Sequence, residues 1–438
     1  MKRGFTLGAI AMALLAGAAA TAADLQTAYR EAKKYDATYA AAQAALRAGV
    51  EGRDQARAEW LPKVSVSAGV AQSENQQADP RTGQLKSATG ANYKIGLSQP
   101  IYDVRASVGS AKLNESARLA EVQFQAAEQD LAVRVAQAYF DVLYAQDSVE
   151  FVRAQKDAVS QQLAQAKKSF EVGVATITDT HEAQARYDAI TAAEIAALND
   201  LLVKQSAFQL LTGLSADGLT PLSSRLQATP PQPNDVSAWV SEAEAKSQQI
   251  DAKRGALALA TADIDLYRAA RQPIVGLEAG FGDGMSRIGG HNYNSKGSGS
   301  VGINLTIPVY TGGATSSKLR ETIARRDQAQ SDLEATRREV VLKTRQAFLG
   351  VQSGAAQIRA LEQALVSTQS SLDSTRLGKD VGVRTTLDLL NAQQQYYSTR
   401  RDLARARYDY LLNRLRLKQA VGDLAERDVE LLNAELSR

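Results

Sequence analysis

The chain has 438 residues, of which only 6% are aromatic, and this excludes two or three thick globular cores built on large side chains. Its 51 basic and 48 acidic residues nearly cancel, which gives no electrostatic case for nucleic acid as a partner. The absence of cysteine excludes a disulfide scaffold, so packing or assembly must hold the chain together.

Residues 1–22 have the form of a secretory signal peptide. Lys2 and Arg3 supply the basic end, residues 7–16 the apolar run, and residues 20–22 a cleavage site of small side chains. The alternative is a membrane anchor, but the apolar run is shorter than the roughly 20 residues that a spanning helix needs. No later stretch reaches that length without charges, so we expect no membrane helix in the mature chain.

Two long blocks, 101–220 and 309–438, contain no proline and are therefore free to form very long helices. In each block apolar residues recur at helical spacing on one face. These residues are Leu131, Val135, Ala138 and Val142 in the first block and Ala404, Tyr408, Leu411, Leu412 and Leu415 in the second. An ordinary coiled coil shows the same pattern, so it predicts helical packing and nothing more specific.

Four segments between the helical blocks alternate between apolar and small or polar residues, as β-strands do. They cover residues 64–70, 93–97, 274–286 and 301–307. Each pair is predicted to form a hairpin whose strands are joined by a polar loop of roughly 15 residues. Such alternation is typical of strands with one face in lipid and the other in water. A half-buried hairpin of a soluble protein has the same local pattern.

One sequence pattern occurs twice and sets the architecture. Residues 172–179 read VGVATITD, and residues 381–388 read VGVRTTLD. The agreement continues to a shared tyrosine, Tyr187 in the first copy and Tyr396 in the second. An internal duplication of this kind predicts two structural repeats, each a helical hairpin with a Gly-Thr-Asp corner.

The predicted organisation follows from the duplication. The first repeat, 23–235, comprises a helix, a β-hairpin near 62–103, a long helical hairpin over 105–213 and a linker over 214–235. The second repeat, 236–438, comprises a helix, a β-hairpin near 273–310, a long helical hairpin over 312–422 and a C-terminal tail. The longer arm of each helical hairpin would extend about 100 Å at 1.5 Å per residue. The fold class is therefore mainly α with a small β part.

Four transmembrane strands cannot close a barrel alone, because closed membrane barrels begin at about eight strands. Unpaired strand edges are not tolerated in hydrocarbon, so several chains would have to share one barrel. A cyclic trimer would supply twelve strands, although composition does not fix the number of subunits.

The chain resembles the TolC family of outer-membrane channel-tunnels across essentially its whole mature length. The motifs that carry the resemblance are AEWLP ending at Pro62, SQPIY ending at Tyr102, IPVYTGG beginning at Ile307, and the segment 381–396. The resemblance implies a homotrimer with a twelve-stranded barrel in outer-membrane lipid and a helical tunnel across the periplasm.

The resemblance also implies a function. Members of the family are exit ducts for efflux or type I secretion, and they dock an inner-membrane transporter and a periplasmic adaptor protein. The lipid-anchored efflux branch begins with an acylated cysteine, so this cysteine-free chain is closer to the branch that serves both protein secretion and efflux. The sequence does not identify the cargo, which could be protein, drug or metal.

The duplicated corners contain the candidate site residues. Thr176 with Asp179 and Thr385 with Asp388 have the spacing of a helix capping box, which explains much of their presence. The resemblance implies that this corner is the periplasmic mouth of the tunnel. Three copies of Asp388 would then form an acidic ring that binds cations. Asn391 stands where the family often has a second acid, so a double ring is not expected.

Two further links are expected at the mouth from the resemblance. Arg384 matches an arginine that bonds to the first hairpin at the position of Thr178 and holds the mouth closed. A family tyrosine that bonds to the acid at Asp179 is replaced here by Lys379, so an ion pair between Lys379 and Asp179 could substitute.

No residues are predicted to serve catalysis, a cofactor or a metal. His181 and Glu182 lack the second histidine of a zinc helix, and the segment 310–318 has the wrong spacing for a phosphate loop. The competing class is a secreted helical-bundle or adhesin-like structural protein that transports nothing. That alternative does not explain paired amphipathic hairpins at matching places in both repeats.

Overall fold

A computed structural model describes residues 24–78, 85–223, 226–288, 291–294 and 296–436. The predicted signal peptide therefore lies outside the described residues. The chain divides into two compact units, and each unit takes segments from both halves of the sequence. Unit 1 comprises Met1–Ala41, Ala126–Ser247 and Glu339–Arg438, and unit 2 comprises Ala42–Gln125 and Gln248–Arg338.

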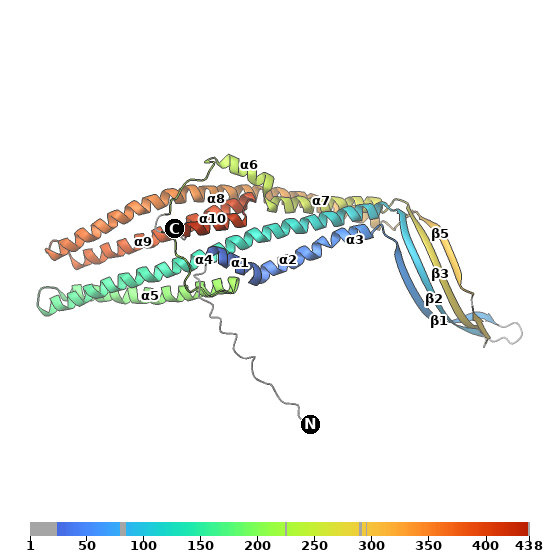
Figure 1. Ribbon diagram of the computed structural model, residues 1–438, viewed down its shortest axis with the longest axis horizontal. Helices are drawn as coiled ribbons and strands as arrows, with labels where there is room; N and C mark the ends of the chain where they lie inside the picture. Colours follow the sequence, from blue (N-terminus) through green and yellow to red (C-terminus); the bar gives the residue numbers. More distant parts are fainter. Residues whose placement is uncertain (1–23, 79–84, 224–225, 289–290, 295, 437–438) are drawn as a thin grey trace, which may run out of the picture. The chain divides into compact units, whose positions relative to one another are not determined.

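Two long helical hairpins account for most of the helix, as the proline-free blocks predict. The first pairs α4 (Val104–Glu171) with α5 (Ile177–Thr212), and the second pairs α8 (Ala314–Asp380) with α9 (Thr386–Val421) (Figure 1). Each returning helix has 36 residues and ends at a glycine in the left-handed conformation. Within the described residues, none of the helices is long and apolar enough to cross a membrane.

The core of unit 1 lies on the helical faces that the sequence predicts. Leu131, Val135 and Val142 on α4 are fully buried, as is Leu411 on α9. Aromatic rings pack within this core, where the fully buried Tyr139 of α4 lies edge-on against Phe208 of α5 and Phe140 stacks on Tyr408. Because the helix faces consist mainly of alanine and small aliphatic residues, these rings supply much of the buried apolar area.

Three shorter helices complete unit 1: α1 (Leu25–Tyr35), α6 (Val236–Lys246) and α10 (Glu426–Leu436). Helix α10 forms within the segment expected to be a C-terminal tail. It contacts α1 through Asn433, whose Oδ1 accepts from the Leu25 amide and whose Nδ2 donates to Asp24. The two ends of the described chain are thus tied together by direct hydrogen bonds.

The single helix expected at the start of each repeat is interrupted in both repeats. The first is divided into α1, α2 (Ala37–Val50) and α3 (Gly52–Ala58), and the second into α6 and α7 (Gln248–Ala269). Asp36 and Ser247 take extended backbone angles at these breaks, with ψ of 117° and 123°. Asp36 then accepts the amide of Tyr39, so it ends one helix and starts the next.

Unit 2 contains one antiparallel sheet. Its strands are β1 (Lys63–Ala78), β2 (Leu85–Tyr102), β3 (Ile274–Ile288), β4 (His291–Asn294) and β5 (Ser298–Thr306). Strands β1, β2 and β3 pair in that order, and both β4 and β5 pair with β3 (Figure 1). Strand β1 therefore forms one edge of the sheet and β5 the other.

The first two strands are longer than expected, because their pairing extends into the predicted polar loop. The ladder between β1 and β2 continues through Asn75 opposite Lys86 and, after an irregularity, Ala78 opposite Leu85. Backbone hydrogen bonds of a ladder do not require apolar side chains, so periodicity alone underestimates strands with polar ends. The tip at residues 79–84 lies outside the described residues.

Candidate functional site at the helical corners

The two hairpin corners share one backbone geometry, as the duplication predicts. Gly173 and Gly382 take positive φ angles of 77° and 81°, which residues with a Cβ rarely adopt. Equivalent hydrogen bonds of 2.8 Å from amide to carbonyl join Val174 to Ser169 and Val383 to Gly378. The duplicated sequence therefore encodes two copies of the same turn.

The predicted capping boxes are confirmed at both corners. The amide of Asp179 donates to Oγ1 of Thr176 at 3.2 Å, and the Thr176 amide donates back to the Asp179 carboxylate at 2.9 Å. The corresponding distances for Asp388 and Thr385 are 3.1 and 3.0 Å. Each box satisfies amides that would otherwise lack partners at the start of a returning helix.

The corners also expose apolar side chains at matched positions. The four valines at 172, 174, 381 and 383 are between 66% and 82% exposed in the chain. Isolated exposed valines need no explanation, but four of them beside two identical turns form a repeated apolar surface.

The pKa of the Asp388 carboxyl is lowered. The backbone and side-chain hydrogen bonds from Thr385 hold the pKa of this carboxyl below the usual value, and the nearby charge of Arg384 adds to this. The Arg384 stem packs over Gly378, where an added Cβ would lie 2.8 Å from the arginine Cγ. In the described part of this single chain, Arg384 makes no hydrogen bond to Thr178, which is exposed.

Lys379 connects the second hairpin to the first through two glutamines. Its ammonium group donates to Oε1 of Gln162 and, at 3.0 Å, to Oε1 of Gln165, both on α4. Burial lowers the pKa of Lys379, while the negative charges of Asp380 and Asp179 oppose that shift. Asp179 thus lies close enough to attract the ammonium, although no ion pair within 4.0 Å joins these two described residues.

The two hairpins also share a small apolar core near the corners. Its buried members are Val152, Val159, Leu163, Ala166, Ala183, Ile190 and Leu390. One helical turn after Asp388, Asn391 accepts a hydrogen bond of 3.0 Å from Arg186 on α5. The residue that stands in place of a second acid therefore links the two hairpins.

The sequence predicts Lys379 as a link between the hairpins but does not identify the residues that it binds. Gln162 and Gln165 are two among many glutamines on these helices, and nothing in their spacing distinguishes them. The repeat comparison marks Lys379 itself, since Phe170 occupies its position in the first repeat, but it gives no signal for the two glutamines. Within the described ranges, no group of three or more His, Cys, Asp or Glu side chains could hold a metal ion.

Paired helical hairpins with repeated corners, together with strands that expose apolar side chains such as Val66, Val70 and Val301, are the parts that the resemblance predicts for an outer-membrane channel subunit. The sequence profile of the family described as "Outer membrane efflux protein" matches residues 28–214 and 239–423. The chain belongs to this family, as its resemblance to TolC proteins predicts.

Named relatives agree with this assignment. The chain is 36% identical over 421 residues to outer membrane protein TolC of Vibrio cholerae, covering 95% of this chain and 94% of the relative. It is 34% identical over 414 residues to alkaline protease secretion protein AprF of Pseudomonas aeruginosa, covering 93% and 86%. The solved structure of CusC has the same fold, with a TM-score of 0.78 at 20% identity and 92% coverage of each chain.

The chain is therefore an outer-membrane exit duct of the kind used in efflux and type I secretion. A secreted structural protein that transports nothing, the alternative considered from the sequence, is not favoured. The two-repeat, mainly helical fold with a small β part is confirmed.

Proposed function

We propose that three copies of this chain form one channel, in which β1, β2, β3 and β5 of each copy share a twelve-stranded barrel in the outer membrane. The edges of the sheet support this proposal. Each of β1 and β5 has one neighbouring strand in the described chain, so both leave backbone groups unpaired on their outer sides. Such groups are costly in hydrocarbon, and pairing β1 of one copy with β5 of the next removes the cost.

Aromatic residues near the strand ends support membrane insertion. Trp60 precedes β1, Tyr102 ends β2 and Tyr310 follows β5, and all three side chains are exposed. Tyrosine and tryptophan are enriched where a membrane meets water, because their rings are amphipathic. These residues would mark the periplasmic border of the barrel.

The helical corners would form the periplasmic mouth, with Asp388 as a threefold ring of negative charge. The lowered pKa of Asp388 supports this role, because the ring would stay ionised throughout the physiological pH range. Arg384 would restrain the mouth through Thr178 of this or a neighbouring subunit. Lys379 would do so through Gln162 and Gln165, with Asp179 adding attraction at longer range.

The mouth would dock a periplasmic adaptor protein, and through it an inner-membrane transporter. The exposed valines of both corners provide an apolar surface repeated six times in a trimer. A partner with short apolar contacts in the same repeat would fit that surface.

The cargo would pass without chemical change, and no residue of this chain is assigned a catalytic, cofactor or metal-binding role. The relative AprF is named for protease secretion, which favours a protein as one class of cargo. Deleting the gene and comparing secreted proteins with sensitivity to toxic small molecules would separate protein export from efflux.

Native mass measurement in mild detergent tests the assembly. We expect a trimer whose reconstitution into planar bilayers produces discrete conductance steps. A stable, folded monomer that produces no steps would contradict both the shared barrel and the channel.

A further inference from the structure

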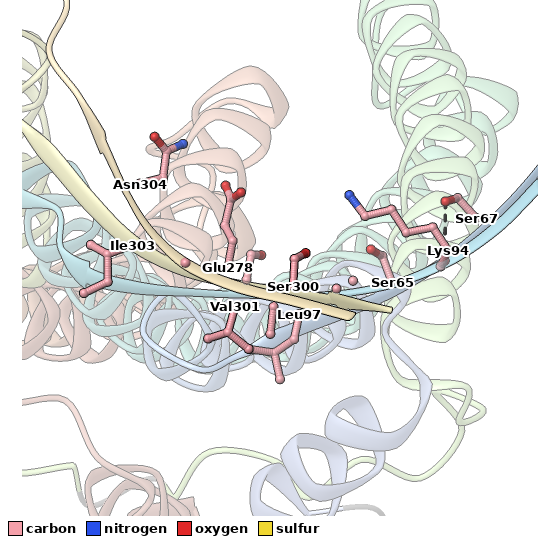
Figure 2. A pocket seen from close by; sticks show the side chains of 14 residues that line it. Ser65, Ser67, Lys94, Leu97, Glu278, Ser300, Val301, Ile303 and Asn304 are labelled. Carbon is pink, nitrogen blue, oxygen red and sulfur yellow. Dashed lines mark hydrogen bonds between the residues drawn. The ribbon is translucent and has the colours of Figure 1, made fainter. Parts of the chain in front are cut away.

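The two faces of the sheet differ in chemistry, since side chains alternate along each strand. One lateral row of paired residues contains Ser65, Gly96, Gly280 and Ser300, and the adjacent row contains Val64, Leu97, Ala279 and Val301. Figure 2 shows Lys94, Glu278, Ser300 and Asn304 on one side of the strands and Leu97 and Val301 on the other. The sheet therefore has a polar face and an apolar face.

The apolar face exposes a broad surface of aliphatic side chains, which would be unfavourable in contact with water. Val66, Val70, Val301 and Ile303 are each between 71% and 79% exposed in the chain. In an outer-membrane protein the partner for a broad apolar sheet surface is the hydrocarbon of the lipid. The polar face must then point to the interior of the proposed barrel.

The polar face is lined mainly by small neutral residues around two charges. Lys94 and Glu278 line a pocket of about 510 Å³ together with serines, glycines and Asn304. The Lys94 stem lies over β3, where a Cβ added at Gly280 would be 3.2 Å from the lysine Cε. Within the described residues no ion pair within 4.0 Å joins Lys94 to Glu278, so neither charge is neutralised by direct contact with the other.

The register distinguishes the surroundings of the two charges. Glu278 is opposite Ser98, which is opposite Lys63, so the row that contains the acid also contains a base. The row of Lys94 contains Ser67, Gly282 and Ser298, none of which carries an opposite charge. Of the three charges that Lys63, Lys94 and Glu278 place on this face, two are positive and one is negative.

We propose that Lys94 and Glu278 set the ion selectivity of the membrane segment of the channel, with Lys94 favouring anions and Glu278 opposing it. The inference rests on the proposed trimeric channel, in which each residue occurs three times around the lumen. Rings of charged side chains raise the local concentration of the opposite ion, and lumen substitutions tune selectivity. The membrane segment would therefore favour anions, opposite to the preference of the Asp388 ring.

Reversal potentials in planar bilayers with a potassium chloride gradient test the proposal. Lys94→Gln should move the reversal potential toward the potassium equilibrium potential, and Lys94→Glu should move it further. Glu278→Gln should move it in the opposite direction. Lys94→Arg keeps the charge and should leave the reversal potential unchanged.

The absence of native cysteine allows a second, independent measurement. In the open channel, Lys94→Cys should react with a negatively charged methanethiosulfonate reagent and change the current. The neighbouring Ile95→Cys, on the apolar face, should not react. If both Lys94→Glu and Glu278→Gln form channels of normal conductance but leave the reversal potential unchanged, the proposed selectivity role is wrong while the proposed channel function stands. A wild-type protein that forms no channel would instead overturn the proposed function, and this inference with it.

Discussion

The ammonium group of Lys379 on α8 donates a hydrogen bond to Oε1 of Gln162 on α4, which is only 7% exposed. A side chain of the second hairpin is therefore held by a buried side chain of the first. Since the two helices lie in different repeats, any opening that separates the hairpins must break this bond. The bond is thus a physical candidate for a restraint on the mouth.

Removing this restraint should favour the open mouth. A single hydrogen bond contributes about 0.5–1.5 kcal/mol, and three copies in a trimer act on the same aperture. A combined bias of about 1.5–4.5 kcal/mol would change the ratio of open to closed channels roughly 10–2000-fold. Lys379→Ala and Gln162→Ala should both raise the mean single-channel conductance in bilayers. Gln161→Ala, an exposed neighbour on the same helix, is the matched control and should leave it unchanged.

Arg384 is proposed as a separate restraint, so its removal should add to the effect of removing Lys379. Arg384→Ser should raise conductance, and the double variant with Lys379→Ala should raise it further. Asp388→Asn should instead weaken block by multivalent cations applied from the periplasmic side, because it would remove the proposed charge ring. If neither change has these effects, the corner is only a helix cap.

Cation block should depend on pH in a direction set by Asp388. Its folded pKa is lowered, so the carboxylate stays charged down to a pH below the ordinary value of 3.8. Block should therefore be constant between about pH 7 and pH 5 and decline only under more acidic conditions. Titrating the block by a trivalent cation measures this directly. A decline centred near pH 6 would show that another group carries the block.

The sequence predicts the parts of this fold that depend on hydrophobic periodicity and on the positions of proline, glycine and capping residues. Proline-free blocks gave the long helices, the two glycines gave the corners, and the Thr-x-x-Asp spacing gave the capping boxes at Asp179 and Asp388. The polar ends of β1 and β2 were not predicted, because the hydrogen bonds of a ladder do not depend on side-chain polarity. The helix breaks at Asp36 and Ser247 were not predicted either, because each depends on a single residue that adopts extended backbone angles within an otherwise helical sequence pattern.

Contacts between the repeats could not be predicted from one sequence. The apolar core near the corners and the bond from Arg186 to Asn391 join residues more than 200 positions apart. The sequence shows that position 391 holds an asparagine in place of an acid, but it does not show which residue the Asn391 amide binds. Such partners depend on how two helices pack, which their individual periodicity leaves open.

A half-buried acid, Asp147, lies between the same two hairpins. The Tyr408 hydroxyl on α9 donates a hydrogen bond of 2.8 Å to Oδ2 of Asp147 on α4. Burial raises the pKa of Asp147, Glu150 adds to the rise, and the Tyr408 bond opposes it together with the charges of Arg400 and Arg407. Tyr408→Phe should therefore raise this pKa further and leave the carboxylate without its donor.

The sign of the pH effect follows from that shift. Because the pKa of Asp147 is higher in the folded state than its ordinary value of 3.8, the folded state binds more protons than the unfolded state between these two pKa values. The stability that Asp147 contributes therefore falls as the pH rises from 3.8 through its folded pKa. Tyr408→Phe should cost about 1–3 kcal/mol at neutral pH, where the carboxylate is charged and unsatisfied. The deficit should shrink as the pH falls from neutral toward the raised pKa of Asp147, which thermal unfolding in detergent at a neutral and an acidic pH value would measure. Tyr397→Phe is the matched control, since Tyr397 on α9 donates to the backbone carbonyl of Ala154 on α4, which does not titrate in this range. Its deficit should be the same at both pH values, and an equally constant deficit for Tyr408→Phe would contradict the role assigned to Asp147.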